Sequence, residues 1–467
     1  MLVAAFTNLL AGFATDNLNR KYVSVFALIV MSAATAAMGF AQTYWHVLVA
    51  RIMQAAGQAF APPLAYSMIA DLFGKDQRAS ASGVYASGVY VGYGASSLSL
   101  LLIAREGWRF TSYTAGITGA VLVVALATFV SEPLREAYRA KKTTNVVTTK
   151  ADGSLNNDIQ SPLLTSESSD AVDGPASPND VTTDLPASDS AAKVGDITVV
   201  TERPSIWRSM ALAMQPTDMR VMIVASAFRM AGGIVMGSFL PAYFKQHFPS
   251  QRDQFAIINS IVVATAGTMS SLFGGRLADL LMRRASEKLR EEARTSLLTT
   301  SVNGDESASA EANRNVEEVE AKIKGLQDLS PFALCSALSC ILSVPFFVGV
   351  FFIPNLYAAM AMLFLAYLLS ECWYAPTFCI IHNYTAVPAH VKGVATSIMM
   401  AGTSIIACGA PVLVGAIDDK YNSVQWEMVG GVLVPNFIGG LLFLIVYAAQ
   451  KRFAKQRASN IVLSGYQ

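Results

Sequence analysis

The sequence predicts an all-α, multi-pass membrane protein built from two pseudo-symmetric helical bundles. Of the 467 residues, 53% are hydrophobic and 14% are charged, and the mean hydropathy is +0.42, well above that of soluble proteins. Uncharged runs of eighteen or more residues, which are long enough to cross the hydrocarbon core of a bilayer, recur along the chain. One short charged pattern occurs twice, once in each half. Together these three observations predict the fold class.

The apolar runs predict about eleven membrane segments. The run Leu329–Ser370 is 42 residues long, too long for one span, and Pro354-Asn355 is the natural turn that divides it into two. Two segments contain a single charge each, Arg51 and Arg229. In order, the segments are residues 1–11, 22–42, 46–70, 79–104, 110–131, 221–244, 254–275, the two parts of 329–370, 393–417 and 428–450.

The distribution of lysine and arginine predicts the orientation of these segments. If Arg20 and Lys21 lie in the cytoplasm, most of the remaining basic residues near the segment ends lie there too, as the positive-inside rule requires. Trp45, Trp108 and Trp426 then fall at the outer ends, where interfacial aromatic residues are common. We therefore expect an integral, multi-pass membrane protein.

Composition divides the chain into bundles and polar segments. We expect a first bundle in residues 1–131, a cytoplasmic linker in 132–215, a second bundle in 216–450 and a basic cytoplasmic tail in 451–467. Residues 142–204 are rich in Ser, Thr, Asp and Asn, which predicts disorder. The second bundle also contains a polar insertion, 285–329. Within these regions, 205–214 is interpreted as an interfacial helix or as plain linker, and 315–324 as a short amphipathic helix or as plain linker.

The repeated pattern reads Gly-x3-Asp-x3-basic-basic and marks the predicted cytoplasmic ends of helices. It occurs as Gly12, Asp16, Arg20 and Lys21 and, 263 residues later, as Gly275, Asp279, Arg283 and Arg284. A second match, of Arg78 and Gly88 with Lys392 and Gly402, has an offset of 314 residues. The two offsets differ by about the length of the polar insertion. The two halves therefore align as a duplicated bundle, a common architecture of transporters.

The double pattern, the central linker and the two matched bundles resemble the major facilitator superfamily. More narrowly, Arg51-Ile-Met-Gln-Ala-Ala-Gly57-Gln58-Ala59, Pro62, Asp71-Leu-Phe, Arg78, Gly107-Trp108-Arg109, Pro133, Pro241-x-Tyr243 and Gly274-Gly275 are similar to Spinster-like transporters of lysolipids and sphingolipids. The resemblance implies alternating access, a lipid-like cargo, and a location in an organelle membrane of lysosomal type or in the plasma membrane. The chain departs from that family in two ways. The family's first helix carries an acidic residue that faces the cavity, and we expect this helix to be missing here. In addition, Gln58 stands where the family's pattern has Glu.

The repeated residues are predicted to gate the cytoplasmic side. Gly12 and Gly275 allow close helix approach, while Asp16 and Asp279 can accept hydrogen bonds from the N-terminus of a neighbouring helix. The basic pairs of the two copies are expected to anchor at lipid headgroups and to pair with acidic loop residues. Asp71 and Arg78 form the equivalent corner after the predicted segment 46–70, which corresponds to the family's fourth helix. The alternative is that all of these residues are static topology anchors.

Charges within a span are costly, so each is a functional hypothesis. Arg51, Gln54 and Gln58 share one helix face and are predicted to line the central cavity, where Arg51 can meet an anionic group. The alternative is an arginine that snorkels outwards. Arg229 and Glu371 are predicted near mid-depth, within roughly 8 Å of each other. Glu371 is then the hypothetical site of proton coupling, and the alternatives are a permanent salt bridge or a Glu that faces a neighbouring helix.

Signals of catalysis are absent from the sequence. It contains no phosphate-binding Gly-rich loop with Lys, no His-Glu-x-x-His and no Gly-x-Ser-x-Gly, and the near-zero net charge argues against nucleic-acid binding. We therefore expect that the protein is not an enzyme and that it binds no metal and no cofactor. The predicted function is secondary transport of a small solute, amphiphilic or anionic, with membrane lipid around the protein. The alternative is a transport-inactive receptor or scaffold that acts through its cytoplasmic loops. The sequence does not fix the oligomeric state.

Overall fold

The computed structural model describes residues 2–130, 206–302, 319–388, 391–421 and 424–463. One compact unit contains both halves of the membrane region, whereas the second unit, 137–205, falls outside the described residues together with the predicted disordered segment 142–204. Every described element is a helix or a helical turn.

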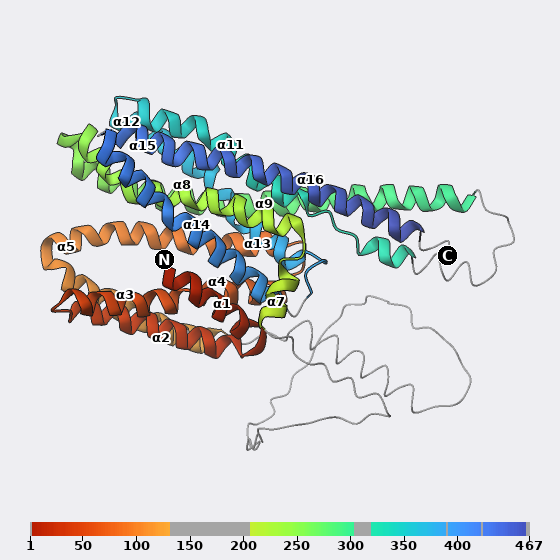
Figure 1. Ribbon diagram of the computed structural model, residues 1–467, viewed down its shortest axis with the longest axis horizontal. Coiled ribbons are helices and arrows are strands. Elements are labelled where there is room, and N and C mark those ends of the chain that lie inside the picture. Colours follow the sequence, from red (N-terminus) through yellow and green to blue (C-terminus); the bar gives the residue numbers. More distant parts are fainter. Residues whose placement is uncertain (1, 131–205, 303–318, 389–390, 422–423, 464–467) are drawn as a thin grey trace, which may run out of the picture. The chain divides into compact units, whose positions relative to one another are not determined.

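The first half consists of α1 (Leu2–Asn17), α2 (Arg20–Gly39), α3 (Tyr44–Gln58), α4 (Ala61–Leu72) and α5 (Arg78–Phe129). The chain folds back within α5 at Gly107, whose φ of +86° favours glycine. Figure 1 shows the reversal in orange. The reversal lies between the two predicted segments 79–104 and 110–131, so α5 comprises two antiparallel limbs.

The second half contains longer helices. They are α7 (Ile206–Ala213), α8 (Thr217–His247), α9 (Arg252–Val302), α11 (Ser330–Phe352), α12 (Leu356–Ser370), α13 (Tyr374–Asn383), α14 (Lys392–Tyr421), α15 (Val424–Met428) and α16 (Val434–Leu463). Eight helices of the described residues are long and apolar enough to cross a membrane. The other three predicted segments coincide with α1, with α3 plus α4, and with the first limb of α5. The all-α, multi-pass fold is therefore confirmed.

Two membrane segments are broken at equivalent points. The segment predicted as one span over 46–70 is two helices, because α3 ends at Gln58 and α4 begins at Ala61, just before Pro62. In the second half, a 3-10 turn (Glu371–Trp373) separates α12 from α13, again just before a proline, Pro376. Proline cannot donate a backbone hydrogen bond, so it ends the preceding helix. Pro376 lies 314 residues after Pro62, the offset of the sequence repeat.

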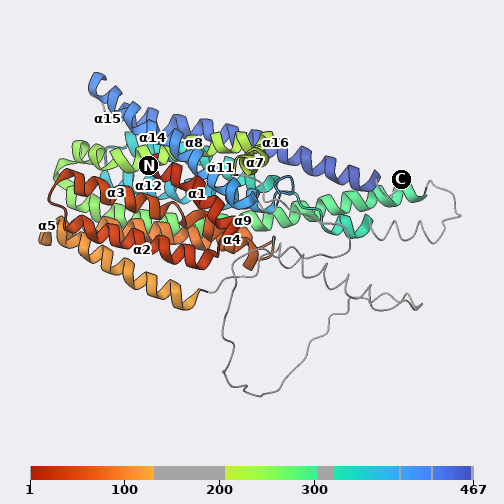
Figure 2. The same ribbon diagram turned by 60° about the horizontal axis from the view of Figure 1, so that its bottom comes forward.

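Beyond the membrane region, α9 and α16 continue side by side, as Figures 1 and 2 both show. The sequence predicts a polar insertion and a tail here, but these residues pack around a separate apolar cluster. Its members are Leu289, Ala293, Leu297, Val319, Ile323, Leu326, Ala454, Ala458 and Val462. On each long helix the cluster residues recur every four positions, so they form one apolar stripe. Helix α7 likewise occupies the segment for which plain linker was the alternative.

Candidate functional site

The two repeated aspartates join the halves of the molecule at the same end. Asp16, on α1, accepts hydrogen bonds from the backbone N–H of Gly393 (3.1 Å) and Val394 (3.0 Å) at the start of α14. Asp279, on α9, accepts from the backbone N–H of Ala79 (3.2 Å) and Ser80 (2.7 Å) at the start of α5. Each aspartate therefore caps the N-terminus of a helix in the opposite half, where the helix dipole favours an anion.

These two contacts are equivalent under the internal repeat. Asp279 lies 263 residues after Asp16, and Gly393 and Val394 lie 314 residues after Ala79 and Ser80. The first offset was predicted from the two aspartates themselves and the second from Arg78 and Gly88, but the backbone partners were not predicted. Applying both offsets to one contact would have predicted the other.

The two glycines of the pattern lie where two helices pack closely against each other. A Cβ on Gly12 would lie 2.5 Å from the Ser397 Oγ, and a Cβ on Gly275 would lie 2.4 Å from the backbone oxygen of Ala79. Real Cβ atoms do not approach other atoms so closely. Any larger residue at Gly12 or Gly275 would therefore separate α1 from α14 or α9 from α5.

The basic residues of the pattern occupy different environments. Arg20 is 1% exposed and forms an ion pair with Asp71 at 2.6 Å, so the expectation that it anchors at lipid headgroups is wrong. The pairing with an acidic residue is present, because α4 brings Asp71 back towards the start of α2. Arg283 and Arg284 are exposed, and the Arg283 guanidinium donates to the backbone oxygen of Asp76 at 3.0 Å. Lys21 is partly buried.

Arg78 makes a third link between the halves. Its guanidinium donates to Asn383 Oδ1 at 2.7 Å and to the backbone oxygen of His382 at 3.3 Å, and it also binds the carbonyl of Ala70. The equivalent residue, Lys392, donates to the same His382 oxygen at 2.5 Å. The sequence predicted Arg78 at this corner, but not its partner Asn383, which lies at the end of a different helix, α13.

Further along the helices from the contacts of Asp16, Asp279 and Arg78, four aromatic side chains from both halves meet. Tyr66 on α4 stacks on Phe378 of α13, with ring centroids 4.3 Å apart and planes at 7°. Tyr85 and Tyr374 contact the Tyr66 ring at 5.3 and 6.2 Å. This aromatic layer closes the interface between the halves with apolar surface. No sequence signal pointed to it, because isolated aromatic residues in apolar helices do not reveal their partners.

The predicted charge pair forms a direct ion pair. Arg229 Nη2 lies 2.7 Å from Glu371 Oε1 and 3.1 Å from the backbone oxygen of Ser370, at the break between α12 and α13. The other carboxylate oxygen, Oε2, accepts a hydrogen bond of 2.6 Å from the Tyr90 hydroxyl on α5. Arg229 is only 3% exposed. The two side chains are thus closer than the predicted 8 Å, and their role in coupling stays a prediction.

The other predicted cavity residues lie apart from this pair. Arg51 is exposed and donates to Gln54 Oε1 at 3.1 Å, and Gln54 in turn donates to the Thr35 hydroxyl on α2 at 3.0 Å. Among the contacts of the described residues, none links these side chains to Arg229 or Glu371. Gln54 therefore contacts α2, and the assignment of Arg51 and Gln54 to the central cavity stays a prediction.

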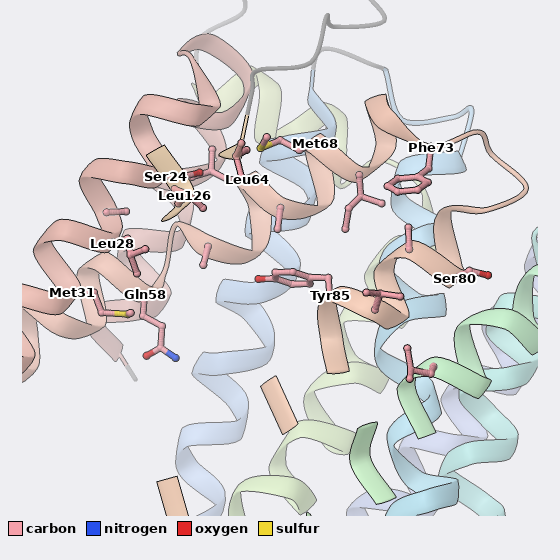
Figure 3. Close-up of a pocket in the computed structure, with 18 of the residues that line it drawn as sticks. Ser24, Leu28, Met31, Gln58, Leu64, Met68, Phe73, Ser80, Tyr85 and Leu126 are labelled. Atoms are coloured by element: carbon pink, nitrogen blue, oxygen red, sulfur yellow. The ribbon is translucent and has the colours of Figure 1, made fainter. Parts of the chain in front are cut away.

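Gln58 lines a separate apolar cavity of about 840 Å³. Figure 3 shows Gln58 at one side of this cavity and Tyr85 near its middle. The wall is formed by the first-half helices α2, α4 and both limbs of α5, including Leu28, Met31, Leu64, Met68 and Leu126. Leu272 and Arg276 of α9 complete it. In the described residues, no group of three His, Cys, Asp or Glu side chains is arranged to hold a metal ion.

Comparisons with known proteins agree with this architecture. The family model described as Major Facilitator Superfamily matches residues 1–289. The human organic anion transporter MFSD10 (TETRAN) shares 12% identity, with a TM-score of 0.54 over 96% of this chain and 81% of that protein. A bacterial homologue of the human lysosomal transporter Spinster, in an inward-facing and unoccupied conformation, shares 16% identity, with a TM-score of 0.49 over 98% and 88% of the two chains.

One curated sequence also aligns. It is a "Putative metabolite transport protein" of Haemophilus influenzae, 28% identical over 144 residues, or 31% of this chain. The alignment spans about a third of that relative, 35% of its length. The family model, by contrast, covers more than half of the present sequence, and it includes both copies of the repeated pattern. The chain therefore belongs to the major facilitator superfamily.

Proposed function

We propose that this membrane transport protein carries its cargo by alternating access, with its two halves rocking about a central site. The observation that supports the proposal best is the pair of equivalent contacts made by Asp16 and Asp279. The first N–H groups of a helix have no partner within that helix. Opening this end would therefore exchange aspartate for water at α5 and α14 without breaking their internal hydrogen bonds. Such contacts are suited to repeated release and re-formation.

The proposed cargo is a small amphiphilic or anionic solute of lysolipid or sphingolipid type. Its support is the resemblance of the region from Arg51 to Arg78, which spans α3, α4 and the start of α5, to the Spinster-like transporters. Proton coupling through Glu371 is the second part of the proposal. Glu371 is a partly buried carboxylate that contacts both halves, through Arg229 and Tyr90. Protonation would remove the charge that Arg229 neutralises, and would thereby weaken a contact at the centre of the molecule.

Flux measurements in proteoliposomes test both parts. We expect uptake of a labelled lysolipid to exceed that of a small, wholly water-soluble anion, and to depend on the pH gradient. Glu371→Gln preserves the shape of the side chain but removes its titration, so uptake should lose its pH dependence. Uptake of the water-soluble anion alone would overturn the cargo class. A Glu371→Gln protein that keeps the full pH dependence would reject coupling through this residue.

A transport-inactive receptor or scaffold is the second candidate. The observation that favours it is the packed extension of α9 and α16, which presents a folded surface outside the membrane region. No flux of either solute in liposomes that contain folded protein would support this candidate over the carrier.

A further inference from the structure

We propose that Tyr90 is a positioning residue that holds Glu371 against the opposite half of the molecule, so that the protonation state of Glu371 sets how firmly the two halves are closed. This inference rests on the proposed function and extends it to a residue that the sequence analysis did not single out. The two oxygens of the Glu371 carboxylate have different partners. Arg229, in the same half, holds Oε1 at 2.7 Å, whereas Tyr90, in the other half, donates to Oε2 at 2.6 Å.

The ring of Tyr90 is fixed by close packing between α5 and α9. Tyr90 is 9% exposed, and a Cβ on Gly267 would lie 2.3 Å from the Tyr90 Cδ1 atom. Only glycine at 267 leaves room for the ring in this position. The hydroxyl therefore reaches Glu371 from a side chain with little freedom to turn away.

The bond from Tyr90 joins the same two halves as the Asp279 contact, but it lies further along α5 and reaches the 3-10 turn. Asp279 binds the first turn of α5 at Ala79 and Ser80, and Tyr90 follows on the same helix about ten residues, or about 15 Å, further along. Helix α5 is thus tied to the second half by polar contacts at two depths, with Asp279 of α9 and with Glu371 of the 3-10 turn, and the aromatic layer around Tyr66 lies beside them.

The charge on Glu371 determines the strength of the deeper contact. A hydrogen bond to a carboxylate is roughly twice as strong as one between neutral groups. Protonation of Glu371 would therefore weaken the bond from Tyr90 and the attraction to Arg229 together. The titratable groups that interact with Glu371 from the surrounding elements are Arg229 of α8, Tyr90 and Tyr93 of α5, Cys340 of α11, Tyr367 of α12 and Cys372 of the 3-10 turn. Arg229 is the cation among them.

A native cysteine reports the opening of this interface. Cys379 of α13 is 2% exposed, and its Sγ lies 3.6 Å from the Ser82 hydroxyl of α5, across the two halves. In full-length protein with the other four cysteines replaced by alanine, the rate of maleimide labelling at Cys379 measures exposure of the interface. Labelling needs no substrate, so it separates this inference from the proposed transport activity.

Tyr90→Phe keeps the ring and removes the hydroxyl. We expect Cys379 to label about tenfold faster in this variant at a pH where Glu371 is ionised, as for the loss of one hydrogen bond to a charged group. At a pH low enough to protonate Glu371, labelling of the unsubstituted protein should rise towards the rate of the variant. Tyr113→Phe, on the other limb of the same helix, where the ring contacts Phe40 of the same half, is the matched control and should leave the rate unchanged.

Two further variants make the outcome decisive. In a Glu371→Gln background, Tyr90→Phe should change the labelling rate by less than about twofold, because the charged acceptor is already gone. Gly267→Ala should accelerate labelling by displacing the ring without deleting the hydroxyl. Equal labelling of Tyr90→Phe and unsubstituted protein at all pH values would overturn the inference even if uptake is pH-dependent. If uptake does not depend on pH but Cys379 labels faster in Tyr90→Phe, the coupling proposal is rejected and the contact from Tyr90 still stands.

Discussion

The second half of the molecule contains a helix at a place where the first half has a cavity. In the second half, α8 packs against α14 and α16, and its Arg229 reaches the break between α12 and α13. The repeat relates α14 and α16 to the two limbs of α5, and it relates the break between α12 and α13 to the break between α3 and α4. In the first half, the cavity of about 840 Å³ lies among those elements and α2 (Figure 3).

This difference explains the chemistry at the two helix breaks. Glu371 sits at the break in the second half, where α8 supplies Arg229 as a counter-charge. The repeat relates Glu371 to Gly57 in the first half, and the next residue, Gln58, lines the apolar cavity there. An ionised carboxylate in an apolar environment is costly unless it is paired. A neutral amide is therefore the residue that this side of the molecule tolerates.

The largest expected effect tests the role of the counter-charge. Arg229→Met should lower the free energy of unfolding by about 3–5 kcal/mol, because it leaves the Glu371 carboxylate buried without its cation. Arg51→Met, at the exposed arginine of the first half, should change it by less than about 0.5 kcal/mol. Denaturant unfolding in detergent micelles provides the measurement. Equal losses from both substitutions would show that the two halves do not differ in this way.

A double variant provides the control for this comparison. Combining Arg229→Met with Glu371→Gln removes both charges, so much of the loss should be recovered. If the double variant is as unstable as Arg229→Met alone, the cost comes from lost packing of the arginine side chain and not from an unpaired carboxylate.

The sequence predicted the features that depend on position along a helix. The depth of Arg229 and Glu371 follows from counting residues at a fixed rise, and the two offsets follow from counting between repeats. The helical stripe of Leu289, Ala293 and Leu297 was equally readable, although the sequence analysis did not use it. Arg20 was misplaced because its burial depends on where α4 ends, which brings Asp71 beside it.

Features that depend on which helix lies opposite were not predictable in this way. Tyr90 and Tyr66 resemble any aromatic residues in apolar helices, and their partners Glu371 and Phe378 are about 280 and 310 residues away in sequence. Only the lateral packing of the helices brings them together. The small residue Gly267 offers a signal after the fact, because it leaves room for a large side chain on the opposite helix.

The next comparison uses two alanines related by the repeat. Ala375 is 2% exposed in the second half, while Ala61, which precedes it by 314 residues, is exposed and lines the cavity. Ala375→Leu should lower the free energy of unfolding by about 1–3 kcal/mol through overpacking. Ala61→Leu should be tolerated within about 0.5 kcal/mol, because the cavity has room for the added carbons. Thermal unfolding of the two purified variants decides the matter, and a large loss for Ala61→Leu would mean that this space is occupied in the folded protein.

The smallest expected effect compares two buried tyrosines. Within the described residues, the Tyr66 hydroxyl of the first half is buried without a hydrogen-bond partner, whereas the Tyr243 hydroxyl of α8 donates to the backbone oxygen of Phe351 at 2.8 Å. Tyr66→Phe should therefore keep or raise the free energy of unfolding by up to about 1 kcal/mol, since an unpaired polar group is removed from an apolar layer. Tyr243→Phe should lower it by about 1 kcal/mol. If Tyr66→Phe is the more harmful of the two, the aromatic layer binds the hydroxyl in a conformation other than this one. The two halves would then close on each other through a polar contact at that depth as well.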